Sequence, residues 1–128
     1  MVKNRLYAII MVMKMKNERR KYGRLTLSYP VEITSPKKVK DSQTQDVSIR
    51  GMCLVSPVPF KENSLLKMKL KLDSEKNLTI SIQGKVVWKM KKANKEYHHG
   101  ILITDIKDSE RDIFRKLLAT KLIELLLN

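Results

Sequence analysis

Two stretches of two-residue alternation constrain the fold of this chain more than any other feature. From Leu66 to Leu72 apolar residues alternate with lysines, and from Leu78 to Met90 the even positions are apolar except for Gly84. Side chains of a β-strand point alternately to its two faces, so this period predicts strands with one buried face. Gly84 predicts a bend or bulge of the kind that closes a small barrel. Trp88, on the apolar face, is expected in the core.

The chain before and after these stretches continues the β pattern. Residues 25–33 alternate between apolar and polar, with Pro30 indicating an edge position or a bulge. Residues 37–45 are polar and predict a turn followed by a short exposed strand that leads into Asp46. Further strands are expected at residues 52–55 and 97–104.

One helix is expected after the last strand. It should begin between Asp105 and Ser109, where Asp and Ser can cap the first turn, and continue to Leu127. Short strands followed by a single helix are typical of an antiparallel barrel or sandwich with the helix on its rim or side. The end of the helix is more apolar than one small barrel needs: Leu122, Ile123, Leu125, Leu126 and Leu127. We therefore expect a homodimer through this helix, the alternatives being a frayed tail or a docking site for another protein.

Length and charge limit the classes of function. A chain of 128 residues suffices for one domain with a core. Its 27 basic residues against 13 acidic ones give a net charge of +14, which favours anionic partners without choosing among them. Cys53 is the only cysteine, so no intrachain disulfide forms, which fits a cytoplasmic location.

The first residues contain a short apolar run, Leu6–Met13. It is far shorter than the roughly 20 residues that span a bilayer, so no membrane span is expected. Charged residues follow it where a signal peptide would have small ones. We interpret it as an additional strand or helix packed on the domain, or alternatively as an interfacial or partner-binding segment.

Two short motifs carry the functional information: Arg20-Lys-Tyr-Gly-Arg24 and Asp46-Val-Ser48-Ile-Arg-Gly51, together RxxxR…DxSxxG. A carboxylate accepts the N–H groups of the Watson–Crick edge of guanine, and guanidinium groups donate to its Hoogsteen edge and to phosphates. Asp46 and Ser48 are two residues apart, so in an extended chain they project to the same side. These residue types suit a guanine nucleotide that carries phosphodiester charges.

The combined motif resembles the signature of the PilZ domain, a bacterial receptor module for the second messenger cyclic di-GMP. The resemblance covers residues 18–120 and implies a mainly β fold, a six-stranded antiparallel β-barrel with a C-terminal α-helix. It places a PilZ-like domain at residues 18–128 after an N-terminal extension, residues 1–17. It also implies that Arg20 and Arg24 contact phosphates and guanine, and that Asp46 and Ser48 hydrogen-bond guanine.

Each of these residues also has a simpler interpretation. The arginine string fits a solvated basic linker, and Asp46 with Ser48 fits a turn that caps a strand. Arg50 either adds a phosphate contact or is a plain surface arginine, and Gly51 permits a turn or a close backbone approach. In the family an arginine at the position of Arg19 tends to accompany two stacked ligand molecules rather than one.

No catalytic or metal site is expected. The sequence contains no Ser/His/Asp grouping, phosphate-binding Gly-rich loop or paired carboxylates. The adjacent His98 and His99 lie on an expected strand, so they face opposite sides and cannot chelate a metal together. The chain departs from the family at His98, where many members have a small residue. It also departs at Asn63, which replaces a turn glycine and tolerates positive φ.

Three functions compete. The leading hypothesis is a cyclic di-GMP receptor without enzymatic activity or cofactor, whose liganded state is transmitted to an unidentified effector protein. A small basic β-barrel also suits single-stranded nucleic acid, but such proteins display exposed aromatics, and here aromatics are 5% of residues. Nucleic acid is therefore not an expected partner. The third function is a PilZ-like protein-interaction module that has lost nucleotide binding; such modules typically lack the RxxxR string.

Overall fold

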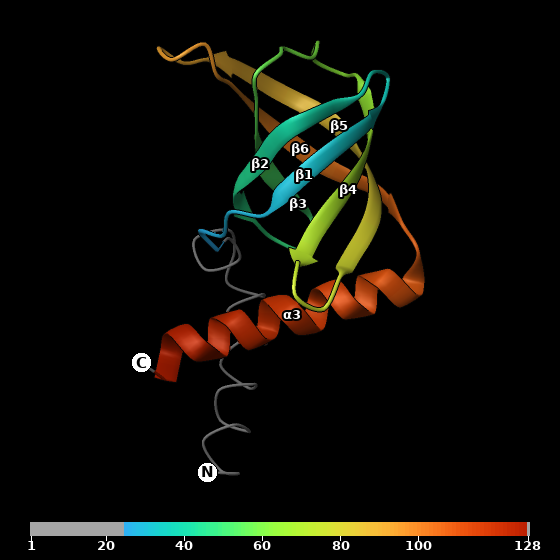
Figure 1. The fold of residues 1–128 in the computed structure, drawn as a ribbon, viewed down its shortest axis with the longest axis vertical. Helices are drawn as coiled ribbons and strands as arrows, with labels where there is room; N and C mark the ends of the chain where they lie inside the picture. The colour runs from blue at the N-terminus through green and yellow to red at the C-terminus, as the bar shows by residue number, and fades with distance from the viewer. Residues whose placement is uncertain (1–24, 128) are drawn as a thin grey trace.

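A computed structural model describes residues 25–127, which form six strands and one helix (Figure 1). The elements are β1 (Pro30–Ser35), β2 (Val39–Val47), β3 (Gly51–Ser56), β4 (Leu65–Asp73), β5 (Leu78–Lys91), β6 (Tyr97–Ile106) and α3 (Asp108–Leu127). The strands form a closed antiparallel barrel in the order β1-β2-β3-β6-β5-β4. The expected fold is confirmed. The N-terminal extension, residues 1–17, lies outside the described residues.

The barrel is filled by the inward-facing residues of every strand. Burial alternates along the whole of β4, with Leu66, Met68 and Leu70 inside and the three lysines outside. Removing such a side chain from water stabilises the fold by about 1.5–3 kcal/mol. Phe114 and Leu118 of α3 complete the core, because the helix runs beneath one end of the barrel (Figure 1).

The first two strands differ in length from the prediction. The alternation from residue 25 predicted a strand there, but β1 begins at Pro30. The segment before β1 is held by Thr44 of β2. The Thr44 hydroxyl accepts the N–H of Tyr29 at 2.8 Å and donates to the carbonyl of Leu27 at 2.6 Å. The expected turn with a short exposed strand over residues 37–45 is wrong in part, because β2 is a full barrel strand that buries Ser42 and Thr44.

The longest strand, β5, contains two irregularities. The pairing with β6 shifts between Gln83 and Gly84, which confirms the expected bulge, and shifts again between Val86 and Trp88. The prediction that Trp88 lies in the core is wrong: its side chain is 37% exposed. Beyond Val86 the strand runs past the barrel interior, so the apolar alternation continues where there is no core to fill.

The helix α3 begins at Asp108, within the expected range, and is tethered to the barrel near its start. Glu110 accepts the backbone N–H of Ser81 on β5 at 2.9 Å. At its other end Leu125 is 64% and Leu127 is 55% exposed. Among residues 25–127 no helix has the length and apolar content needed to cross a membrane.

Candidate functional site

The DxSxxG motif forms the turn between β2 and β3. Ser48 follows β2 directly, and its hydroxyl accepts the N–H groups of Arg50 at 3.3 Å and Gly51 at 3.2 Å. The backbone N–H of Ser48 donates to the Gly51 carbonyl at 2.8 Å. The turn-capping interpretation of this serine is therefore correct as local structure. It leaves a fixed hydroxyl at the rim of the barrel.

The side chain of Asp46, near the end of β2, is hydrogen-bonded to the neighbouring strand β3. The β2–β3 register shifts between Thr44 and Asp46, and the Asp46 carboxylate accepts the N–H of Cys53 at 3.1 Å. The carboxylate thus takes the place of a backbone carbonyl in the ladder. Val47 is fully buried while Asp46 and Ser48 are half-buried on either side of it. Both polar side chains therefore lie away from the core, as their two-residue spacing predicts.

Gly51 is required by the strand opposite it. A Cβ at this position would overlap the backbone carbonyl of Ile101 on β6. The expected close backbone approach is therefore present, and any side chain would force β3 and β6 apart. Arg50 is exposed at the tip of the turn, and its carbonyl accepts the N–H of Ile103 at 2.8 Å. Its side chain faces solvent beside the motif.

The arginines of the first motif, Arg19, Arg20 and Arg24, lie outside the described residues. The residue that follows them, Leu25, exchanges two backbone hydrogen bonds with Val47, at 2.8 and 2.9 Å. Val47 stands between Asp46 and Ser48. The chain therefore enters the barrel beside the second motif, although the two motifs are two dozen residues apart in sequence.

A row of four residues crosses the outer face of the barrel from this motif. Cross-strand pairing places Asp46 opposite Cys53, Cys53 opposite Gly100, and Gly100 opposite Trp88. Opposed residues share a face, and neighbouring strands lie about 4.8 Å apart, so the row is roughly 14 Å long. It has a carboxylate at one end and an exposed indole at the other. Between these two ends Cys53 is buried and Gly100 lies beneath the indole.

Trp88 is the residue of this row that sequence reasoning missed, because an apolar position on an alternating strand suggested the core. Its indole lies across Gly100, where a Cβ would overlap the ring. The missed signal was length: the alternating run that ends at Met90 is longer than the one that ends at Leu72. A longer strand paired with a shorter one must extend beyond it.

The two adjacent histidines face opposite sides, as expected. His99 points inward and is fully buried. Its Nε2 accepts the N–H of Phe60 at 3.1 Å, so Nδ1 carries the hydrogen and donates to the carbonyl of Leu54 at 3.3 Å. Burial lowers the pKa of His99 below its ordinary 6.5, the bond to Leu54 partly opposing this shift. His99 is therefore a neutral structural residue of the core.

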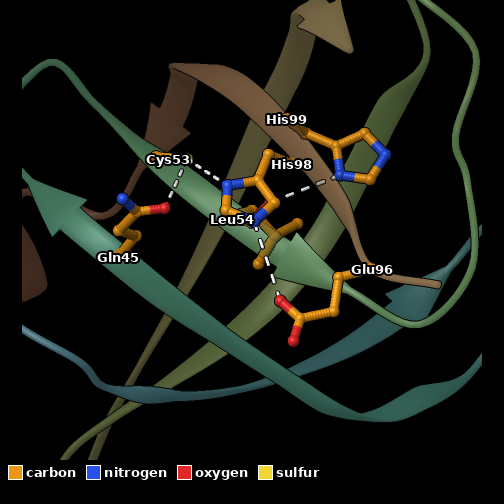
Figure 2. A network of polar contacts seen from close by, with 6 residues as sticks. All are labelled: Gln45, Cys53, Leu54, Glu96, His98 and His99. Carbon is orange, nitrogen blue, oxygen red and sulfur yellow. Dashed lines mark hydrogen bonds and ion pairs between the residues drawn. The ribbon is translucent and has the colours of Figure 1, made fainter. Parts of the chain in front are cut away.

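His98 belongs to a polar network on the outer face, shown in Figure 2. Its Nδ1 lies 3.9 Å from the Cys53 sulfur, and its Nε2 lies 3.7 Å from a carboxylate oxygen of Glu96. The Cys53 sulfur is also 3.8 Å from Oε1 of Gln45. The order of cysteine, histidine and acid is that of a nucleophilic triad, but the thiol is buried, so a substrate cannot reach it. Within residues 25–127 no three metal-binding side chains gather.

Comparison with known proteins identifies the family and the fold. The PilZ domain family matches residues 18–120. Similar solved structures include the Bacillus subtilis inhibitor of motility, MotI/DgrA, with 18% identity and a TM-score of 0.68. Others are Escherichia coli YcgR in complex with cyclic di-GMP, with 10% identity and a TM-score of 0.66, and apo MrkH of K. pneumonia, with 18% and 0.65.

These similarities extend over most of this chain but only part of the other proteins. The alignments cover 86%, 84% and 84% of this chain and 52%, 47% and 53% of MotI/DgrA, YcgR and MrkH, respectively. The chain thus spans about half the length of these proteins. No curated protein sequence matched.

Proposed function

Because the chain belongs to the PilZ domain family, we propose that it binds cyclic di-GMP and passes the liganded state to a partner protein. The observation that carries the proposal is the Asp46–Gly51 turn, whose outward carboxylate and hydroxyl lie where Leu25 brings the chain into the barrel. The E. coli YcgR structure contains this nucleotide. No comparison supports single-stranded nucleic acid as the ligand. The proposed receptor has no catalytic activity and acts in the cytoplasm.

The roles proposed for the site residues follow from their chemistry. Asp46 receives the edge of a guanine, since a carboxylate accepts its N–H groups. Ser48 hydrogen-bonds the same guanine by giving up one of the bonds that its hydroxyl makes within the turn. Arg20 and Arg24 contact the phosphates and the other guanine edge through charge-assisted bonds. Two further arginines are assigned lesser roles, Arg19 toward a second ligand molecule and Arg50 toward a phosphate.

We add Trp88 to this proposal. Aromatic side chains stack on bases of any identity, and this stacking contributes about 1–3 kcal/mol per base. The exposed indole lies in the same row as Asp46, on the outer face. One guanine bound by Asp46 would leave the second purine of the dinucleotide within reach of Trp88.

Isothermal titration with cyclic di-GMP tests the proposal, and we expect micromolar affinity or tighter. Arg20→Ala and Arg24→Ala should each weaken binding by roughly 10- to 150-fold, because each charge-assisted bond is worth about 1.5–3 kcal/mol. Arg115→Ala, an exposed arginine of α3, is the matched control and should bind as wild type. Absence of heat at millimolar ligand would overturn the proposal.

Asp46→Ala tests the base assignment separately. It should weaken cyclic di-GMP much more than it weakens cyclic di-AMP, which lacks the guanine edge. Equal weakening of both nucleotides would mean that Asp46 only holds β2 against β3 through its bond to Cys53. A urea titration of this variant shows how much stability that bond provides.

We also propose that α3 mediates a homodimer. Its exposed apolar residues are concentrated at its end: Leu125, Leu126 and Leu127. The helix carries four acidic and four basic residues, so two copies can meet there without the repulsion that a net charge of +14 imposes elsewhere. Light scattering on the full chain and on a chain ending at Thr120 tests this. A full-length monomer at tens of micromolar, or a dimer of the truncated chain, would contradict it.

A further inference from the structure

The strand β5 has an edge that no other described strand covers. Pairing with β4 reaches only as far as Leu65 opposite Lys85, whereas β5 continues to Lys91. From Val87 onward β6 is its only neighbour within residues 25–127. Figure 1 shows β5 and β6 running on together past the rest of the barrel. All residues from Val87 to Glu96 are exposed.

At alternate residues of this edge the backbone N–H and C=O groups point away from β6. Lys92 donates its N–H to the carbonyl of Glu96 at 2.8 Å, so its backbone faces β6. In an antiparallel pair alternate residues direct their N–H and C=O to opposite sides. Lys89 and Lys91 therefore direct these groups to the open edge. Such an edge is a template for a further strand.

The side chains along this edge are basic on one face of the hairpin and apolar on the other. Lys89 and Lys91 pair with His99 and Tyr97 and share one face of the hairpin, while Trp88 and Met90 lie on the other. Trp88 is 37% and Met90 is 51% exposed. Edge lysines discourage pairing with another basic strand, which opposes a second copy of this chain. An acidic strand would be attracted instead.

We propose that the open edge of β5, residues 87–91, is a docking site for an extended acidic segment of a partner protein. The segment adds as a strand, its backbone bonding to Lys89 and Lys91. Its side chains alternate, with acidic residues beside the two lysines and apolar residues beside Trp88 and Met90. The identity of the partner rests on the proposed receptor function, because the acidic segment would belong to the effector protein. Docking of the segment itself needs no nucleotide.

The experiment uses the full chain without cyclic di-GMP and an eight-residue peptide of alternating glutamate and valine. Trp88 is the only tryptophan, so its fluorescence reports the edge directly. The peptide should shift the emission to shorter wavelength with saturable binding. A peptide of the same composition with its glutamates and valines in separate blocks should bind at least tenfold more weakly, because it cannot match both faces at once.

Two variants separate strand addition from simple attraction. Lys91→Pro removes one edge N–H and no bond to β6, and should weaken the alternating peptide at least tenfold. Lys89→Glu/Lys91→Glu keeps the backbone intact and should abolish binding. The matched control is Lys67→Glu/Lys71→Glu, an equal charge change on β4, which has neighbours on both sides; it should change affinity less than threefold. Urea titration confirms that each variant is folded.

Several outcomes would overturn the proposal. Equal binding of the two peptides, or full binding by a folded Lys91→Pro, would exclude strand addition. Equal losses in both charge-reversed proteins would show nonspecific attraction. Binding to vesicles of anionic lipid without binding to the peptide would make this hairpin a membrane contact. A separate titration with cyclic di-GMP on the same protein distinguishes failure here from failure of the receptor function.

Discussion

The two faces of the sheet formed by β3, β6 and β5 are built from alternate residues of the same strands, yet they have opposite character. On the inner face Leu54 and Ile101 pack in the core, and His99 has both ring nitrogens bonded. On the outer face Trp88 is partly exposed, and its indole lies across Gly100 in the same row as Asp46. The two-residue period thus places the residues that stabilise the fold on the inner face of this sheet and the residues of the proposed binding surface on its outer face. Inner changes should therefore cost stability, and outer changes should cost binding.

The largest loss of stability is expected for Leu54→Ala on the inner face of β3. The leucine is fully buried, and deleting such a side chain costs about 2–5 kcal/mol through lost burial and the cavity left behind. Urea unfolding followed by circular dichroism measures this. A loss below 1 kcal/mol would mean that the inner face is not closely packed, and would break the distinction between the faces.

His99→Gln should cost about 1–3 kcal/mol, because the buried N–H of Phe60 and carbonyl of Leu54 lose their partners. The stability of the wild-type protein should also depend on pH. Burial lowers the folded-state pKa of His99, so the unfolded chain binds more protons below pH 6.5. Stability is intact above that pH and falls as the pH decreases from it toward the folded-state value.

Urea midpoints at pH 7.5 and pH 5.5 test the pH dependence. The difference between the two should shrink in His99→Gln. His98→Gln, the neighbouring substitution on the outer face, should keep most of it. If the outer substitution removed more of the pH dependence than the inner one, the assignment of the two histidines to opposite faces would be contradicted.

Gly100→Ala should have a smaller effect on stability, about 1 kcal/mol, because the added methyl overlaps an outward ring that can move. The displaced Trp88 should shift its fluorescence emission. Affinity for cyclic di-GMP should decrease with it if the indole stacks on a purine. Unchanged emission would show that the ring does not lie across Gly100 in solution.

The smallest change in stability is expected for Trp88→Phe, within about 0.5 kcal/mol, since the position is partly exposed. Its effect on cyclic di-GMP should be larger, a several-fold loss of affinity measured by calorimetry, because a phenyl ring gives less area for stacking. If Trp88→Phe bound cyclic di-GMP with wild-type affinity but lost much of its stability, Trp88 would behave as a core residue of the inner face.

Local patterns in the sequence determined much of this fold. Period-two alternation located β4 and β5, and an acidic stretch located the start of α3, because each depends on residues a few positions apart. Gly84 marked a bulge, and Asn63 adopts a positive φ of 71° at the turn where the sequence suggested it. The DxSxxG motif indicated a polar turn for the same local reason.

The tertiary structure alone decided how far each strand is covered by its neighbours and which residues those neighbours allow at a given position. Whether Trp88 is core or surface depends on where β4 begins, not on its own surroundings in sequence. Gly51 and Gly100 are fixed by Ile101 and Trp88, residues of neighbouring strands. Thr44 is buried because it replaces ladder bonds for the segment before β1. Each of these depends on strand pairing across the barrel, which no local pattern encodes.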